Sequence, residues 1–252
     1  MIILLFYLLG AFEYQEIGGS NSALLIVTAG NFPYAATAVN PALLPQLSKN
    51  GIGVVYSHPF NISQIQYNRL NANYKNFGFS VSRLGETGYQ EYNISVSVGF
   101  YFNPNLSYGL TLKGLYLDLA DYGQSFIPAL NFGLAYKIDK LNFGSVIENI
   151  NNPQNDIGEN IPLAIRVGAT FEPVKDFLIG ADLTKTTQDE NIALGVELKP
   201  LPALAVRLGT MANPFIISAG VGFSFKNIYF DYALKYHTNL SETSILSLGY
   251  FW

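Results

Sequence analysis

The stretch Ile245-Leu246-Ser247-Leu248-Gly249-Tyr250-Phe251-Trp252 decides the fold. Side chains of a β-strand point alternately to opposite faces, so the even-numbered residues here, two Leu followed by Tyr and Trp, share one apolar face. The opposite face includes Ser247 and Gly249. A soluble protein seldom ends on a bare Trp, because free chain ends fray into water. An apolar face that ends in aromatic residues is typical of the closing strand of a bacterial outer-membrane barrel, where it contacts lipid.

The same alternation recurs along most of the chain. In Leu163–Glu172 the odd positions are apolar and the even positions are small or polar, and Ile192–Lys199 and Ile228–Tyr236 repeat the pattern. A period of two rather than 3.6 indicates strands. About fourteen such segments have the length that a tilted strand needs to cross a membrane. Within Leu106–Asp118 the alternation changes phase near Gly114, which predicts a β-bulge.

The composition of the 252 residues favours a membrane protein. Charged residues make up 13% and aromatic residues 14%, which leaves few charges for a soluble surface. The net charge of −4 and the lack of a basic stripe argue against nucleic-acid binding. The chain has no Cys, which excludes disulfides and thiolate metal sites, and no apolar run long enough for a transmembrane helix.

The connections between the expected strands alternate between shorter and longer. Outer-membrane barrels have short periplasmic turns and longer external loops, so this alternation predicts an even strand number with both termini in the periplasm. We assign the large apolar face to lipid, because the opposite face, rich in Gly, Ala, Ser and Thr, would make a poor soluble surface. A soluble β-domain with the faces reversed is the alternative. The predicted fold class is all-β, a transmembrane antiparallel β-barrel of about fourteen strands.

Three segments are expected along the chain. Residues 1–16 contain the apolar run Ile2–Leu9, which predicts a secretory signal; because no positive charge precedes it, an ordinary apolar tail or strand is the alternative. Residues 17–50 are rich in Gly, Ala, Asn and Pro and are too apolar to extend into water. They predict an N-terminal plug that enters the lumen from the periplasmic side. Residues 51–252 form the barrel.

The stretch Ala35–Leu44, which reads AATAVNPALL, resembles a run of small residues and an Asn-Pro-Ala signature in the FadL superfamily of outer-membrane barrels, especially its PorV-like branch. Short motifs such as Ile165–Gly168 resemble the same superfamily, and the resemblance covers residues 17–252. It implies a fourteen-stranded barrel with a plugged lumen. The plug motif consists of Asn40, Pro41 and Ala42, where Asn-Pro is either a gate hinge or a simple turn.

The resemblance implies two classes of function in the bacterial outer membrane. The first is passive uptake of hydrophobic small molecules. The alternative is a structural or type IX secretion-associated anchor that binds secreted-protein partners. Outer-membrane lipid is the expected partner of the barrel in both cases. The sequence has no Gly-x-Ser-x-Gly elbow and no placed acid–base pair, and neither His58 nor His237 has metal-ligand spacing, so we expect no enzyme, cofactor or metal.

Charged residues on the second-half strands share the face assigned to the lumen. A lone charge on the lipid side is costly, so we expect pairs between neighbouring strands: Arg166 with Asp182, and Glu197 with Arg207. These charges either select solutes or serve as structural ion pairs that pack against the plug. The expected polar lining of the lumen comprises Arg166, Asp182, Glu197, Arg207, Asp231 and Lys235.

Overall fold

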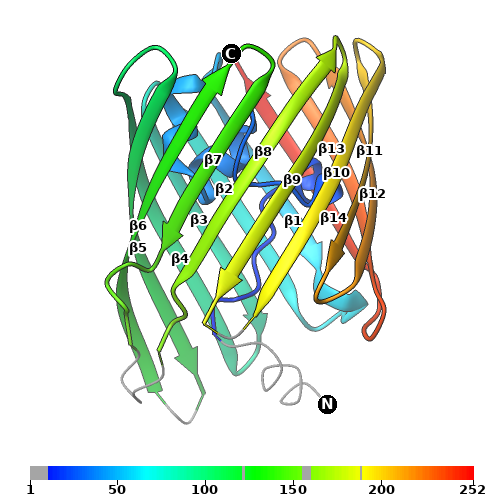
Figure 1. Ribbon diagram of the computed structural model, residues 1–252. Coiled ribbons are helices and arrows are strands. Elements are labelled where there is room, and N and C mark those ends of the chain that lie inside the picture. Colours follow the sequence, from blue (N-terminus) through cyan, green and yellow to red (C-terminus); the bar gives the residue numbers. More distant parts are fainter. Residues whose placement is uncertain (1–10, 121–122, 155–159, 188) are drawn as a thin grey trace.

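Every strand pairs in antiparallel fashion with the strands before and after it in sequence, and the first strand pairs with the last to close a barrel (Figure 1). The computed structural model describes residues 11–120, 123–154, 160–187 and 189–252. Fourteen strands within these ranges confirm the all-β transmembrane barrel expected from the sequence. The strands are β1 (Gly51–His58), β2 (Gln66–Tyr74), β3 (Phe77–Glu86), β4 (Tyr89–Tyr101), β5 (Leu106–Leu119), β6 (Gly123–Ile138), β7 (Leu141–Glu148), β8 (Ala164–Val174), β9 (Phe177–Thr186), β10 (Glu190–Leu201), β11 (Leu204–Ala212), β12 (Ile216–Phe225), β13 (Ile228–His237) and β14 (Thr243–Phe251).

The outer surface of the barrel is apolar. On β14, Leu246, Leu248 and Tyr250 are each at least 40% exposed, whereas Ser247 between them is 2% exposed. The same division into large outward and small inward side chains recurs around the barrel. An apolar surface of this extent is unfavourable in water and matches the lipid-facing band of a transmembrane barrel.

The two ends of the barrel differ in their connections. At one end, which we call the short-turn end, strands are joined by tight turns such as residues 75–76 and 226–227. The C-terminus and the start of β1 lie at this end, at the top of Figure 1. The opposite, long-loop end carries the connections 59–65 and 149–163. Several strands continue into the expected outer loops, so the connection after β3 shrinks to residues 87–88.

The bulge predicted near Gly114 is wrong. Strand β5 pairs with β4 and β6 without a shift of register. Leu115 and Leu117 point into the barrel and are 1% and 5% exposed. The alternation therefore keeps its phase, and what changes toward the long-loop end is the chemistry of the inner face, from polar to apolar.

Residues 11–50, called the N-terminal segment below, lie inside the barrel (Figure 1). Helix α2 contacts strands β10 to β14, α3 contacts β2 to β4, and the 3-10 helix η1 contacts β3 to β6. A further short 3-10 helix, η2, follows β1. The helices are α2 (Gly19–Leu24), α3 (Pro33–Ala38), η1 (Pro41–Gln46) and η2 (Pro59–Asn61). No helix in the described ranges is long and apolar enough to cross a membrane.

The N-terminal segment passes through the barrel from one end to the other. Its described part begins near the long-loop end, where the rings of Tyr14 and Phe60 lie 5.8 Å apart. It ends at the short-turn end, where Asn50 and Trp252 exchange backbone hydrogen bonds. The described part of the segment therefore runs from the long-loop end to the short-turn end, and entry from the periplasmic side stays a prediction. The signal expected over residues 1–16 stays a prediction, because residues 1–10 lie outside the described part of the chain.

Candidate functional site

A belt of glycines on the inner wall lets the barrel backbone contact the N-terminal segment. A Cβ added to Gly144 on β7 would overlap the carbonyl oxygen of Thr28. One added to Gly220 on β12 would lie 2.5 Å from Ala23 Cβ, closer than such atoms approach in proteins. The small-residue face of the strands is thus the docking surface of the segment. Glycines of this belt are Gly53, Gly99, Gly109, Gly133, Gly144, Gly195, Gly209 and Gly220.

Asn40 connects the plug motif to the wall. Its side chain is fully buried, and its Nδ2 donates to the carbonyl oxygens of Thr28 at 2.8 Å and Leu134 of β6 at 3.2 Å. Its Oδ1 accepts a hydrogen bond from the backbone N–H of Ala42 and so caps η1, in which Pro41 occupies the first turn. The side-chain amide of Asn40 therefore connects η1, the backbone at Thr28 and strand β6.

Asp182 on β9 holds the same segment from the opposite wall. Its Oδ2 accepts hydrogen bonds from the backbone N–H of Val27 at 2.7 Å and from the backbone N–H and hydroxyl of Thr28 at 2.9 Å each. The expected ion pair between Arg166 and Asp182 is wrong. The carboxylate of Asp182 is compensated by donors of a segment more than 150 positions earlier in the sequence, which strand pairing could not indicate.

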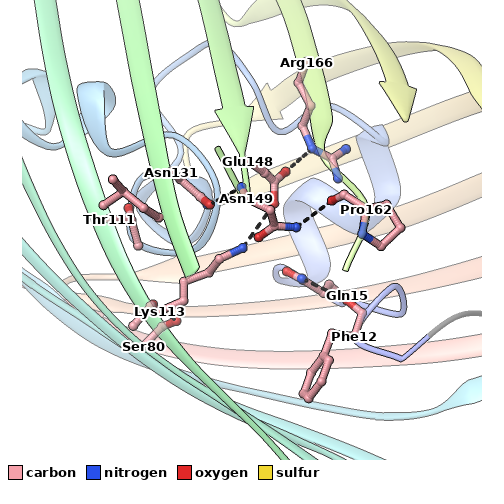
Figure 2. Close-up of polar contacts among 12 residues, drawn as sticks. Phe12, Gln15, Ser80, Thr111, Lys113, Asn131, Glu148, Asn149, Pro162 and Arg166 are labelled. Carbon is pink, nitrogen blue, oxygen red and sulfur yellow. Dashed lines mark hydrogen bonds and ion pairs between the residues drawn. The ribbon is translucent and has the colours of Figure 1, made fainter. Parts of the chain in front are cut away.

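Arg166 on β8 forms its ion pair with Glu148 on β7, and its Nη1 donates to Thr184 Oγ1 at 3.0 Å. Lys113 Nζ on β5 lies 3.8 Å from the other oxygen of Glu148. Lys113 is only 4% exposed and Arg166 is half-buried, and the two cations share one buried carboxylate. Figure 2 shows the three side chains converging inside the barrel. The sequence analysis missed Lys113 and Glu148, although both share the inward phase of their strands.

Asn131 and Asn149 extend this polar cluster toward the connection after β7. The backbone N–H of Asn149 donates to Asn131 Oδ1 at 3.0 Å, and Asn149 Nδ2 donates to the carbonyl oxygen of Pro162 at 2.7 Å (Figure 2). The connection is thereby bound to the part of β6 nearest the long-loop end, which has no pairing partner in β7.

A second ionic cluster crosses three strands near the short-turn end. Arg207 on β11 donates through Nε to Glu197 of β10 and through Nη1 to Asp231 of β13, both at 2.6 Å. The first of these is the pair expected from the sequence. The second crosses β12 because Gly222 leaves room: a Cβ there would lie 2.5 Å from Asp231 Oδ1. Lys199 Nζ lies 3.1 Å from Glu197 and completes the cluster.

Lys235 on β13 pairs with Glu16 of the N-terminal segment rather than with a wall residue. Glu16 is buried and also accepts hydrogen bonds from the hydroxyls of Tyr14 and Ser22, each at 2.7 Å. Burial, together with the adjacent charge of Glu16, raises the pKa of Tyr14 well above its usual value. The phenol therefore stays protonated and able to donate. Each of the six predicted lining residues thus points inward, and two of them hold the N-terminal segment directly.

A cavity of about 420 Å³ opens at the short-turn end, between the N-terminal segment and the wall of strands β8 to β14. Aromatic side chains, including Phe32, Tyr34 and Phe251, line it together with Lys49 and the Arg207 cluster. Among the residues that the structure describes, no group of His, Cys, Asp or Glu could hold a metal ion.

Part of the inner wall at the long-loop end is apolar, next to the buried Glu91 and Asn93 of β4. Strands β5 and β6 direct Leu115, Leu117 and Ile127 inward, where they form a buried cluster with Phe12 and Ile161. We call these five residues the outer apolar cluster. A smaller apolar group, composed of Ile65, Tyr67 and Leu84, lies against Tyr14. The sequence analysis missed both, because it assigned apolar side chains to lipid.

Comparison with solved structures places the fold. The chain superposes on the monoaromatic hydrocarbon channel CymD with a TM-score of 0.66 and 15% identity, covering 96% of this chain and 98% of that one. For the toluene transporter TbuX of Ralstonia pickettii the TM-score is 0.70 at 11% identity, and the superposition covers 95% of this chain and 99% of TbuX. For the toluene transporter TodX of Pseudomonas putida it is 0.63 at 10% identity, with 95% and 98% covered.

These identities are low, so the likeness lies in the fold. The chain is a closed antiparallel β-barrel of fourteen strands with the fold of these channels. No protein family model matches the sequence, and no curated protein matches it. The similarities do not single out the PorV-like branch.

Proposed function

We propose that this barrel is a FadL-type channel for passive uptake of small hydrophobic molecules across the bacterial outer membrane. The observation that carries the proposal is the outer apolar cluster. The interior of a transmembrane barrel is ordinarily polar, and that of this barrel is polar over most of its depth. An apolar inner surface at one end favours binding of an apolar solute, because each Å² of apolar surface removed from water contributes about 25 cal/mol.

The N-terminal segment acts in this proposal as the plug expected over residues 17–50. Its contact with the glycine belt leaves no room for a wide aqueous pore at that level. A plugged barrel excludes polar solutes and lets an apolar solute move from the outer apolar cluster past the segment. The cavity at the short-turn end, at about 420 Å³, has the size of a small-molecule site and would receive the solute on the periplasmic side.

Monoaromatic hydrocarbons are the proposed substrate class, since the proteins of similar fold are described as toluene transporters and monoaromatic hydrocarbon channels. Those proteins are channels and transporters, which agrees with a barrel that is not an enzyme. They lend no support to the alternative of a type IX secretion-associated anchor with secreted-protein partners. We assign the six charged lining residues a mainly structural role, because all of them are held in ion pairs or hydrogen bonds.

Uptake of labelled toluene by bacterial cells that express the barrel tests the proposal. Leu115→Asn places an amide in the outer apolar cluster and should lower the initial uptake rate roughly tenfold, because an unpaired buried amide is costly. Thr111→Ser changes the same inner face of β5 outside the cluster and should leave the rate unchanged. If the barrel is folded in the membrane but uptake equals that of cells without the protein, the transport function is refuted. The secretion-associated anchor would then be the remaining candidate function.

A further inference from the structure

The exposed cations of the barrel gather at one rim. All 14 Lys and Arg of the sequence lie within the described ranges. At the long-loop end the cations outside the lumen are Lys185, which is exposed and paired with Glu190 at 3.3 Å, and the half-buried Arg83, whose Nε donates to Gln90 Oε1. The exposed cations at the short-turn end are Lys75, Lys137, Lys140, Lys175, Lys199 and Lys226.

Acidic side chains show the opposite distribution. Only Asp139, Glu172 and Asp176 accompany the lysines on the surface of the short-turn end. The described acidic residues outside the lumen at the long-loop end are Glu86, Asp118, Asp189, Glu190 and Glu242. The rim that carries the tight turns is therefore net positive, and the opposite rim is net negative. This asymmetry separates the two membrane surfaces that the barrel meets.

Two of the rim lysines lie over aromatic rings that face lipid. Lys75 Nζ lies 5.3 Å from the ring centroid of Tyr74, and Lys226 Nζ lies 5.4 Å from that of Phe225. The two rings are 57% and 70% exposed on the outer surface. Each ammonium group is thus held at the upper edge of the apolar band, where the head groups of a bilayer lie.

The same two lysines flank Trp252. The backbone N–H of Lys75 donates to Asn50 Oδ1 at 2.6 Å, and Asn50 exchanges backbone hydrogen bonds with Trp252. On the other side, the backbone N–H of Phe251 donates to the carbonyl oxygen of Asn227, the neighbour of Lys226 in its turn. The indole is 51% exposed and lies against the ring of Tyr250, with the centroids 5.7 Å apart.

We propose that the short-turn rim binds the head groups of anionic phospholipids, and that Lys75 and Lys226, on either side of Trp252, are two of its binding groups. Each ammonium group would meet the phosphate and negatively charged head group of a lipid, while the acyl chains lie along the exposed aromatic rings. A zwitterionic lipid offers the same chains without the net charge. The proposal needs only the transmembrane barrel and is independent of the transport function proposed above.

Trp252 is the single Trp of the chain and reports on this site alone. The full-length protein is reconstituted in bilayers in which either phosphatidylglycerol or phosphatidylcholine carries bromine near the head-group end of its acyl chains. Bromine quenches the fluorescence of an indole that it touches. At low salt, the relative association constant for phosphatidylglycerol at Trp252 should exceed that for phosphatidylcholine about fivefold. The preference should fall toward one in 1 M salt, where the Debye length is about 3 Å.

The double variant Lys75→Gln/Lys226→Gln should lose the preference, whereas Lys185→Gln, at the opposite rim, should keep it. The differing mobility of boiled and unboiled samples on gels verifies that each variant is folded. Equal quenching by the two lipids in the unaltered protein would overturn the proposal. So would a preference that survives in the double variant, because the lysines would then not be the binding groups.

Discussion

Asp182 binds Thr28 twice, through the backbone N–H and through the hydroxyl, at 2.9 Å each. Together with the bond from the backbone N–H of Val27, this contact gives Oδ2 of a buried carboxylate three hydrogen-bond donors, with no Lys or Arg of the described residues within salt-bridge distance. Asn40, which belongs to the segment itself, makes a second link to the wall. Its Nδ2 donates to the carbonyl oxygen of Thr28 and to that of Leu134 on β6. The backbone of Val27 and Thr28 is therefore hydrogen-bonded both to the wall and to another part of the segment.

The first prediction concerns this contact. Asp182→Ala removes three charge-assisted hydrogen bonds, each of which contributes about 1.5–3 kcal/mol, and should loosen the segment. Amide hydrogen exchange at Val27 and Thr28 should accelerate at least tenfold. Glu190→Ala, which breaks an exposed ion pair with Lys185, is the control and should leave that exchange unchanged. Unaltered protection in Asp182→Ala would show that packing alone holds the segment.

The second prediction concerns the glycine belt and the plug. Gly144→Ala would place a Cβ against the backbone of Thr28, whereas Gly180→Ala would place one 3.1 Å from Ile26 Cγ1, which can shift slightly. In planar bilayers Gly144→Ala should therefore raise ion conductance, and Gly180→Ala should not. Deletion of residues 20–45 should open a pore of still higher conductance. Unchanged conductance after this deletion would contradict the assignment of the segment as a plug.

The third prediction concerns the ionic cluster of Glu197, Arg207 and Asp231. Arg207→Ala leaves the buried Asp231 without its cation and Glu197 with Lys199 alone, and should destabilise the barrel by about 3–5 kcal/mol in denaturant unfolding from vesicles. The triple replacement Glu197→Leu/Arg207→Met/Asp231→Leu removes the three buried charges, leaves the exposed Lys199 to water, and should cost less. A triple variant less stable than the single one would mean that the ion pairs themselves stabilise the fold.

The fourth prediction concerns the lipid face. Leu112 lies midway along β5 and is 62% exposed, so Leu112→Arg should destabilise the barrel by about 2–4 kcal/mol. Phe102, at the short-turn rim and 74% exposed, provides the control, since Phe102→Arg should cost only about 0–1 kcal/mol. Unfolding from vesicles measures both. Equal costs would contradict the proposed depth of the two residues in the bilayer.

The fifth prediction concerns the medium. With large apolar side chains exposed on nearly every strand, the protein should remain monomeric only in detergent or lipid. Analytical ultracentrifugation, before and after detergent removal, checks this. A monomer that stays in solution without detergent would contradict the transmembrane assignment.

Several features of the interior could have been anticipated from the chain alone. Lys113 and Glu148 both follow the inward phase of their strands, so strict alternation along β5 and β7 would have placed both in the lumen. The apparent change of phase near Gly114 concealed the inward position of Leu115 and Leu117, because large apolar residues were taken as the mark of the lipid face. Near the long-loop end this rule fails, since the interior there is apolar as well.

The sequence by itself determined the strands, their number and their outward face, because alternation with a period of two is a local property that lipid and lumen impose on each residue separately. Only the tertiary structure decided which groups compensate Asp182, Arg166 and Lys235, and in which direction the N-terminal segment runs. These outcomes depend on how residues 11–50 dock against strands far away in sequence. Docking of that kind follows from steric fit to a glycine-lined wall and from individual hydrogen bonds, neither of which leaves a periodic pattern in the chain.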